Sequence, residues 1–316
     1  MPQCPICSSS DTSSWSDWCW QMPFAKRDFH YRNCSDCGTV FCDPLPTEQE
    51  LKSYYRDFYN YDWFKKRLPL KKIQAMHRWQ RMQKLFVQYS VTPGNLLDTG
   101  CGHGLFLSRA KRGRWMTTGI DYPSSATRYA SEKQGLKIVE GDLRSLVAEG
   151  RLNNEVFDFA TAWHFLEHDT LPLSCLESFR QVLVPGGKIL IAVPNADSSG
   201  MTLKKEFWVW CQEPYVHIFH FTEKSLSLIA GKAGLKVLST WTRDTWDAHP
   251  LFDVYASMRV RRLSNKLGRF SSPAAFWFEE SVRLACYAAS CHQHWLCERE
   301  RADHRGSELL MLAERA

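Results

Sequence analysis

The sequence predicts an α/β protein with a doubly wound, seven-stranded sheet and a small N-terminal module. Two observations predict the sheet: short apolar runs alternate with amphipathic segments from residue 95 onward, and a glycine-rich loop directly follows the first run. This alternation is typical of a parallel sheet that helices cover on both faces. We expect strands at residues 95–99, 115–120, 136–140, 156–163, 188–193 and 235–242, and a last strand at 308–313 that returns into the sheet.

The bulk composition is that of a globular protein, with 44% hydrophobic and 23% charged residues among 316. No apolar run approaches the roughly 20 residues that cross a bilayer, so we expect no transmembrane segment. The first ten residues lack the charged-then-apolar plan of a secretory signal. We therefore expect a cytoplasmic protein, in which the 12 cysteines are thiols, metal ligands or core residues rather than disulfides.

The cysteine spacing in residues 1–46 predicts a small module that a bound metal ion stabilises. Two C-x2-C pairs can each place two thiolates on one zinc ion and complete a tetrahedron, so zinc would be structural. The predicted ligands are Cys4, Cys7, Cys34 and Cys37. The 26 residues between the pairs are more than a usual finger has, and Cys19 and Cys42 are further thiols that could replace a ligand.

Residues 47–92 form an aromatic and basic connector, with a helix predicted over 73–89. Its 65–84 segment carries eight Lys and Arg residues without an acidic one. Two interpretations stay open: an anionic partner such as an RNA backbone, or the solvated face of an amphipathic helix.

The segment 96–104, LLDTGCGHG, joins the first strand to a helix through a loop that a ligand can approach closely. The third glycine of the dinucleotide-binding pattern is replaced by Leu105. The residues expected at a ligand here are Asp98, Gly100, Cys101, Gly102 and Gly104.

Acidic residues follow the next two strands. Asp121, with Tyr122 after it, can accept hydrogen bonds from ribose hydroxyls, and Asp142 with Leu143 can meet an adenine. The alternative for both aspartates is helix capping.

Several ordered segments resemble a known family. Asp98 with the glycine spacing resembles motif I of class I S-adenosylmethionine-dependent methyltransferases. The segments 157–168, 176–195 and 213–237 resemble the ubiquinone-type, methyltransferase 23-like subfamily, including its EH pair, here Glu167 and His168, and its PGG turn. The N-terminal segment resembles the zinc-ribbon start that precedes methyltransferase domains in bacterial biosynthetic pathways.

The resemblance implies a Rossmann-like methyltransferase sheet over residues 93–316, with a helical insertion at about 244–305, and S-adenosylmethionine as cofactor. It implies a small-molecule acceptor, such as a sugar, a lipid-like compound or a secondary-metabolite intermediate. An RNA methyltransferase and a non-catalytic zinc-ribbon interaction protein are the alternatives. The acceptor atom and the oligomeric state stay open.

Further residues complete the expected site. Trp163 and His164 follow the fourth strand, where they can contact the methionine part of the cofactor. His217 is the first candidate for a general base, and His220 and His168 are reserves, although His168 could only brace its loop. We expect His103 at the helix entry, and Trp208 and Trp210 in a lid, an acceptor wall or the core.

Overall fold

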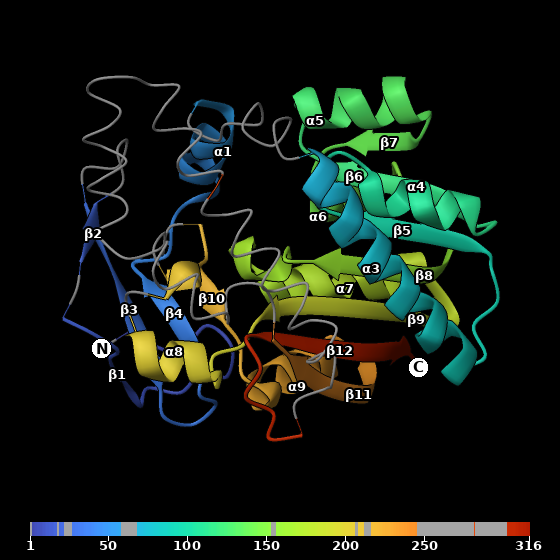
Figure 1. Cartoon of the computed structure of the whole chain (residues 1–316). Coiled ribbons are helices and arrows are strands. Elements are labelled where there is room, and N and C mark those ends of the chain that lie inside the picture. Colours follow the sequence, from blue (N-terminus) through green and yellow to red (C-terminus); the bar gives the residue numbers. More distant parts are fainter. Residues whose placement is uncertain are drawn as a thin grey trace.

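The computed structural model shows two β-sheets with helices packed around the larger one (Figure 1). It describes residues 2–17, 19–21, 27–57, 68–152, 156–205, 208–211, 216–244, 281 and 302–316. The helical insertion predicted at about 244–305 lies outside these residues, apart from residues 244, 281 and 302–305. No described helix is long and apolar enough to cross a membrane.

The larger sheet contains all seven predicted strands and confirms the predicted α/β class. Its strands run in the order β11-β12-β9-β8-β5-β6-β7. They are β5 (Asn95–Thr99), β6 (Met116–Asp121), β7 (Lys137–Glu140), β8 (Phe157–Trp163), β9 (Leu183–Pro194), β11 (Leu235–Arg243) and β12 (Glu308–Arg315). The last strand returns into the sheet, as expected, and pairs antiparallel with both β9 and β11.

Helices cover both faces of this sheet. On one face α3 packs against α4, and on the other α7 packs against α6 and α9 (Figure 1). The described helices that follow α1 (Glu48–Asp57) in the chain have these bounds: α3 (Leu68–Gln88), α4 (Leu105–Arg112), α5 (Ser125–Arg128), α6 (Leu143–Ala148), α7 (Pro172–Val182), α8 (Ser199–Lys204) and α9 (Glu223–Lys232). Short helical turns lie at Tyr129–Lys133, Leu166–His168 and Val209–Cys211.

Each strand divides its apolar side chains between the two faces. Leu96 belongs to the core under α3 and α4, and its neighbour Leu97 belongs to the core under α7. In β12, Leu310 and Leu309 alternate in the same way. Because side chains alternate with a period of two, a slip by one residue would exchange the two cores, and this fixes the register.

The predicted connector helix is present but begins earlier, at Leu68. Trp79, Met82 and Phe86 are buried between α3 and the sheet, as the apolar periodicity indicates. The same three- and four-residue spacing would place Ile73 on this side, but Ile73 is 40% exposed. The first turns of α3 extend beyond the core, and residues there line a cavity instead.

The N-terminal segment forms a smaller antiparallel sheet that shares a strand with the rest of the chain. Its elements are β1 (Thr12–Ser14), β2 (Trp20–Gln21), β3 (Asp28–Cys34) and β4 (Val40–Asp43), followed by α1 (Glu48–Asp57). Strand β10 (Phe219–His220) pairs with β4 and closes this sheet. The two sheets are therefore joined by the segment that carries His217.

Candidate functional site

A cavity of about 640 Å³ lies at the carboxyl edge of β5, β6, β7 and β8, beneath α1 and α3. From β5 the chain continues to β6 on one side, while β8 lies on the other. Such a reversal of strand order opens a crevice between the loops, which is where doubly wound sheets bind ligands.

The glycine loop after β5 forms part of the cavity wall. Gly100, Gly102 and Gly104 all have left-handed backbone angles, with φ of 73°, 51° and 66°. A Cβ at Gly100 would lie 2.9 Å from the Phe165 ring, whereas one at Gly102 would meet nothing within 4 Å. Gly102 therefore leaves its backbone open toward the cavity. Gly104 is not among the lining residues, and its lack of a side chain serves close packing instead.

Asp121 lies at the end of β6 with its carboxylate toward the glycine loop. It accepts hydrogen bonds from the backbone N–H of Gly102 at 2.7 Å and of Tyr122 at 2.8 Å. Burial raises the pKa of Asp121 above its usual range. The capping alternative is wrong for this residue, because Ser124 caps α5. Asp121 is thus free to face a ligand in the cavity, together with the lining residues Cys101 and Tyr122.

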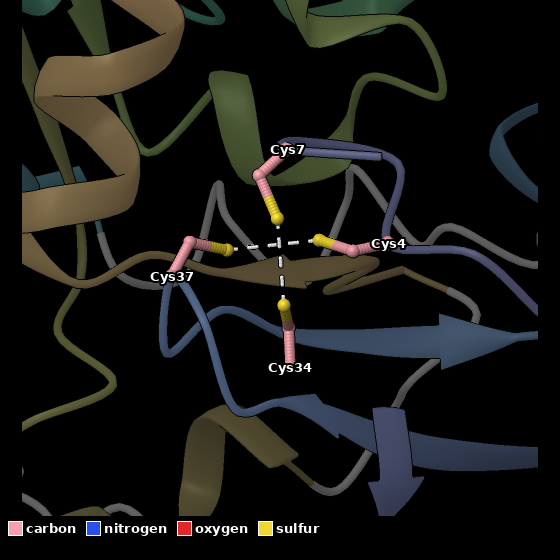
Figure 2. A group of neighbouring side chains, drawn as sticks. All are labelled: Cys4, Cys7, Cys34 and Cys37. Carbon is pink, nitrogen blue, oxygen red and sulfur yellow. Dashed lines mark hydrogen bonds between the residues drawn. The ribbon is translucent and has the colours of Figure 1, made fainter. Parts of the chain in front are cut away.

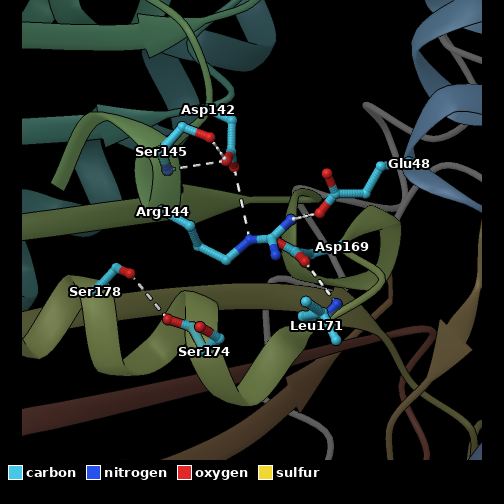
Figure 3. Close-up of polar contacts among 8 residues, drawn as sticks. All are labelled: Glu48, Asp142, Arg144, Ser145, Asp169, Leu171, Ser174 and Ser178. Atoms are coloured by element: carbon cyan, nitrogen blue, oxygen red, sulfur yellow. Dashed lines mark hydrogen bonds and ion pairs between the residues drawn. The ribbon is translucent and has the colours of Figure 1, made fainter. Parts of the chain in front are cut away.

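Asp142 and Arg144 line the neighbouring rim of the cavity. Figure 3 shows the polar contacts that they make. Asp142 caps α6 by accepting a hydrogen bond from the Ser145 N–H at 3.1 Å, so the capping prediction is confirmed here. Arg144 lies 3.4 Å from Asp169 and 2.9 Å from Glu48. It therefore ties α1 to the rim, beside Leu143, which also lines the cavity.

A buried carboxylate and an arginine face the methionine side predicted for the cofactor. Asp98 is 3% exposed and accepts a hydrogen bond from the Thr161 hydroxyl at 2.7 Å. Burial raises the pKa of Asp98 to about 7. The Arg78 guanidinium lies 5.0 Å from the centre of the Trp163 ring. Within the described part of the basic run, Lys71, Arg78 and Arg81 line the cavity. Lys72 and Lys84 are exposed, so the solvated-face interpretation holds for only part of α3.

His164 is held between two buried carboxylates. Its Nε2 lies 2.7 Å from Glu308, and its Nδ1 lies 3.3 Å from Glu167. Burial alone would lower the pKa of His164, but the two adjacent carboxylates, Glu167 and Glu308, outweigh it and raise the pKa to about 9. Arg243 pairs with the other oxygen of Glu308, and Trp210 stacks on the imidazole at 5.1 Å. His164 is consequently an imidazolium in the cavity wall.

Two histidines stand together on the adjoining wall. The His168 and His217 rings are 4.9 Å apart, and both residues line the cavity. Burial, with the neighbouring histidines, lowers the pKa of His217 well below its usual range, so its imidazole is neutral. His220 is fully buried outside the cavity lining and lies 3.1 Å from the Tyr31 hydroxyl. We therefore withdraw His220 as a base, because no acceptor in the cavity reaches it.

The two tryptophans expected near the site have different surroundings. Trp208 is 1% exposed and packs against His220 with ring centres 5.9 Å apart, so it belongs to the core. Trp210 lines the cavity.

The four predicted cysteine ligands converge at one point (Figure 2). The Cys4 and Cys37 sulfurs are 3.6 Å apart, and the Cys7 and Cys34 sulfurs are 3.5 Å apart. Tetrahedral zinc with Zn–S bonds of about 2.3 Å requires sulfurs ~3.8 Å apart, so the donor set fits this ion. Cys19 is exposed, and Cys42 is buried outside the cluster.

Comparison with known proteins shows the family to which the chain belongs. A family model described as a methyltransferase domain matches residues 71–240, which is more than half of the chain. The chain belongs to the class I S-adenosylmethionine-dependent methyltransferase family. The family resemblance expected from the glycine loop and the later segments is thereby confirmed.

Relatives of this methyltransferase domain include a ubiquinone biosynthesis O-methyltransferase from Actinobacillus pleuropneumoniae. The two are 33% identical over 109 residues, which are 32% of this chain and 45% of that enzyme. The chain thus spans about half the length of the curated relatives it matches.

Solved structures share the fold. A possible histamine N-methyltransferase from Thermotoga maritima has a TM-score of 0.52 at 14% identity, with 84% of this chain and 99% of that chain covered. Phosphoethanolamine N-methyltransferase 2 from Haemonchus contortus, solved with S-adenosyl-L-methionine, has a TM-score of 0.52 at 14% identity, with 95% and 71% covered.

Sequence reasoning missed several charged residues of the methyltransferase site. Glu308 and Arg243 reach the cavity because β12 is antiparallel, so its first residue lies beside the last residues of β9 and β11. A carboxylate directly before the apolar run 309–313 was the available signal. Arg78 was noticed only as one of many basic residues, although it directly precedes the buried Trp79 and lies one helical turn before the buried Met82.

Proposed function

We propose that this chain transfers a methyl group from S-adenosylmethionine to a hydroxyl group of a small organic acceptor. The observation that carries the proposal is the single cavity that the glycine loop, Asp121 and the His168–His217 pair line together. Family membership supports the cofactor, and the O-methyltransferase relatives support oxygen as the acceptor atom.

For the cofactor, we assign the residues by the chemistry each can offer. Asp121 can accept from the ribose hydroxyls, and Asp142 with Leu143 stands at the adenine end. Asp98 and Trp163 stand at the methionine end, with Arg78 able to pair with the carboxylate. The phosphoethanolamine enzyme with the same fold was solved with this cofactor, which supports the assignment.

For the reaction, this chain needs to align the acceptor and manage one proton. S-adenosylmethionine supplies an activated methyl group. Holding the acceptor oxygen in line with that group can contribute on the order of 7–11 kcal/mol in favourable cases. His217 is neutral and lines the cavity, which makes it the first candidate to act on the hydroxyl proton.

The geometry favours a small acceptor over RNA. Three basic residues of the 65–84 run line the cavity, where they can contact an anionic group on a small molecule. Within the small-molecule class, we keep sugars, lipid-like compounds and secondary-metabolite intermediates as candidates. The cytoplasm remains the predicted compartment.

We propose further that Cys4, Cys7, Cys34 and Cys37 bind structural zinc. Four thiolates leave no open coordination position, so this ion supplies folding free energy rather than catalysis.

Two measurements test the proposed function. Calorimetry of the full chain with S-adenosylmethionine should show binding, and its absence at millimolar ligand would remove the proposal. Methyl-labelled cofactor should then transfer label to members of a panel of phenols, catechols and hydroxylated sugars. Label in total RNA but in no small molecule would favour the RNA alternative, and binding without any transfer would favour the non-catalytic one.

A further inference from the structure

Three potential metal ligands, separate from the cysteine cluster, meet beside the cavity. One ligand atom each of Glu167, His168 and His217 lies within 4.8 Å of the others. Glu167 and His168 belong to the helical turn Leu166–His168 after β8, and His217 precedes β10. The Ile218 N–H donates to the Glu167 carbonyl at 2.8 Å, which holds the two segments together.

The Glu167 carboxylate is buried without the hydrogen bonds that such a group requires. The residue is 0% exposed, and neither carboxylate oxygen has a hydrogen-bond partner in the described part of the chain. Its nearest cation is His164, at 3.3 Å, which lies closer to Glu308. A buried carboxylate with open lone pairs costs free energy unless something binds it.

His168 directs a lone pair toward this carboxylate, and His217 has a ring nitrogen without a hydrogen-bond partner among the described residues. The His168 Nδ1–H donates to the Val216 carbonyl at 2.7 Å, so its Nε2 carries the lone pair, 3.8 Å from Glu167. The buried Nδ1 of His217 has no hydrogen-bond partner among the described residues. Metal-binding histidines commonly donate their other ring N–H to a carbonyl in this way, because that bond fixes the tautomer.

We propose that Glu167, His168 and His217 bind a divalent transition-metal cation next to the acceptor. Two imidazoles and one carboxylate are a ligand set of catalytic zinc and of other divalent transition metals, and they leave positions open for water or substrate. Tetrahedral N and O ligands lie roughly 3.3 Å apart, so the 3.8 Å between His168 and Glu167 closes by side-chain rotation. Because His168 and His217 line the cavity, the open positions face it.

This site deepens the proposed function and rests on it for its chemistry. The cation binds the acceptor hydroxyl and lowers its pKa, so that the proton passes to water. The resulting oxyanion attacks the methyl carbon, a C–O bond forms, and the C–S bond breaks with its electron pair remaining on sulfur. His217 then acts through the cation, and its own lone pair no longer takes the proton.

Zinc stoichiometry of the full chain tests the site. The protein is dialysed against buffered micromolar Zn²⁺, and bound zinc is measured by mass spectrometry. Wild type is expected to hold two zinc ions, one at the cysteines and one here. Glu167→Gln and His168→Asn should each hold one, with affinity at the second site reduced by at least about 10- to 100-fold. The exposed His30→Asn is the matched control and should hold two.

The outcomes separate this site from the proposed function. The proposed cation site is overturned if wild type binds one zinc ion per chain. It is also overturned if Glu167→Gln and His168→Asn both bind two. S-adenosylmethionine binding is measured in parallel by calorimetry on the same samples. Cofactor binding with one zinc overturns only the cation site, whereas two zinc ions without cofactor binding overturn only the proposed function. Thermal unfolding of each variant shows whether a lost ion reflects a lost fold, and two independent variants guard against this.

Discussion

The Tyr31 hydroxyl donates a hydrogen bond of 2.8 Å to the backbone carbonyl of His217. Tyr31 belongs to the N-terminal sheet, and His217 lines the cavity of the methyltransferase domain. One residue further, the Ile218 carbonyl accepts from the Cys42 N–H at 2.8 Å. The N-terminal sheet therefore holds one wall of the site, so we expect changes at the cysteine cluster to affect that wall.

Replacing Tyr31 with phenylalanine should loosen this wall while keeping the ring in the core. The His217 carbonyl loses its donor, a change worth about 1 kcal/mol. We expect faster amide hydrogen exchange at residues 216–220 and lower turnover, with cofactor affinity nearly unchanged. Exchange in β5 is the internal control, and Tyr89→Phe, directly after α3, is the matched variant. Unaltered exchange at 216–220 would show that the hydroxyl does not position this segment.

Removing zinc should affect both the N-terminal sheet and the cavity. Cys34→Ser deletes one of four converging thiolates, whereas Cys19→Ser changes an exposed thiol outside the cluster. We expect Cys34→Ser to lose the ion and to unfold at a temperature lower by at least about 5 °C, because the ion contributes folding free energy. A chelator should do the same to wild type. Equal melting temperatures for both variants would mean that the cluster is not a structural metal site.

The sheet could be predicted from sequence because its evidence is local. Each strand is a short apolar run. Because β5, β6 and β7 are parallel, the residues at their carboxyl ends lie at the same edge of the sheet, however the helices pack. The run that forms β12 was recognised for the same reason. Asp121 and the four cysteines therefore came from pattern and spacing, and Asp98 came from the resemblance of its segment to motif I.

The rest of the site depends on contacts between distant segments. Glu308 meets His164 only because β12 enters the sheet antiparallel, beside β9. His220 and His217 lie three residues apart, yet β10 turns one into the core and leaves the other in the cavity. No periodicity distinguishes these two histidines, because their difference is set by the pairing of β10 with β4.

Asp121→Ala should weaken cofactor binding by removing the acceptor proposed for the ribose. Hydrogen bonds to a charged group contribute about 1.5–3 kcal/mol, which corresponds to roughly 10- to 100-fold in dissociation constant. Calorimetry with S-adenosylmethionine measures this. Glu132→Gln, an exposed carboxylate beyond α5, is the control. If the variant keeps its affinity for S-adenosylmethionine, the role of Asp121 is only to hold the glycine loop through its hydrogen bond with Gly102.

Arg144→Gln should release α1 from the cavity rim. The guanidinium joins Glu48 of α1 to Asp169, and glutamine is too short and uncharged to keep both contacts (Figure 3). We expect severalfold weaker cofactor binding and faster proteolysis within α1. Arg151→Gln is matched, because Arg151 pairs with Glu149 on the exposed surface. If the two variants behave alike, the Arg144 contacts do not hold α1 in place.

The stability of the chain without cofactor should depend on pH through Asp98. Its pKa is raised by burial from 3.8 to about 7, so the folded state holds a proton that the unfolded state has lost. The unfolding free energy therefore falls as pH rises from about 4 through about 7, since the ionised carboxylate is disfavoured in the core. Between pH 5 and 8 this amounts to roughly 2–3 kcal/mol.

Asp98→Asn removes this titration and keeps an oxygen that accepts from Thr161. Denaturant unfolding at both pH values should show that wild type loses stability relative to the variant as pH rises. A constant difference between the two proteins would mean that Asp98 is ionised throughout. In that case the Arg78 charge, which lowers the pKa of Asp98, outweighs its burial.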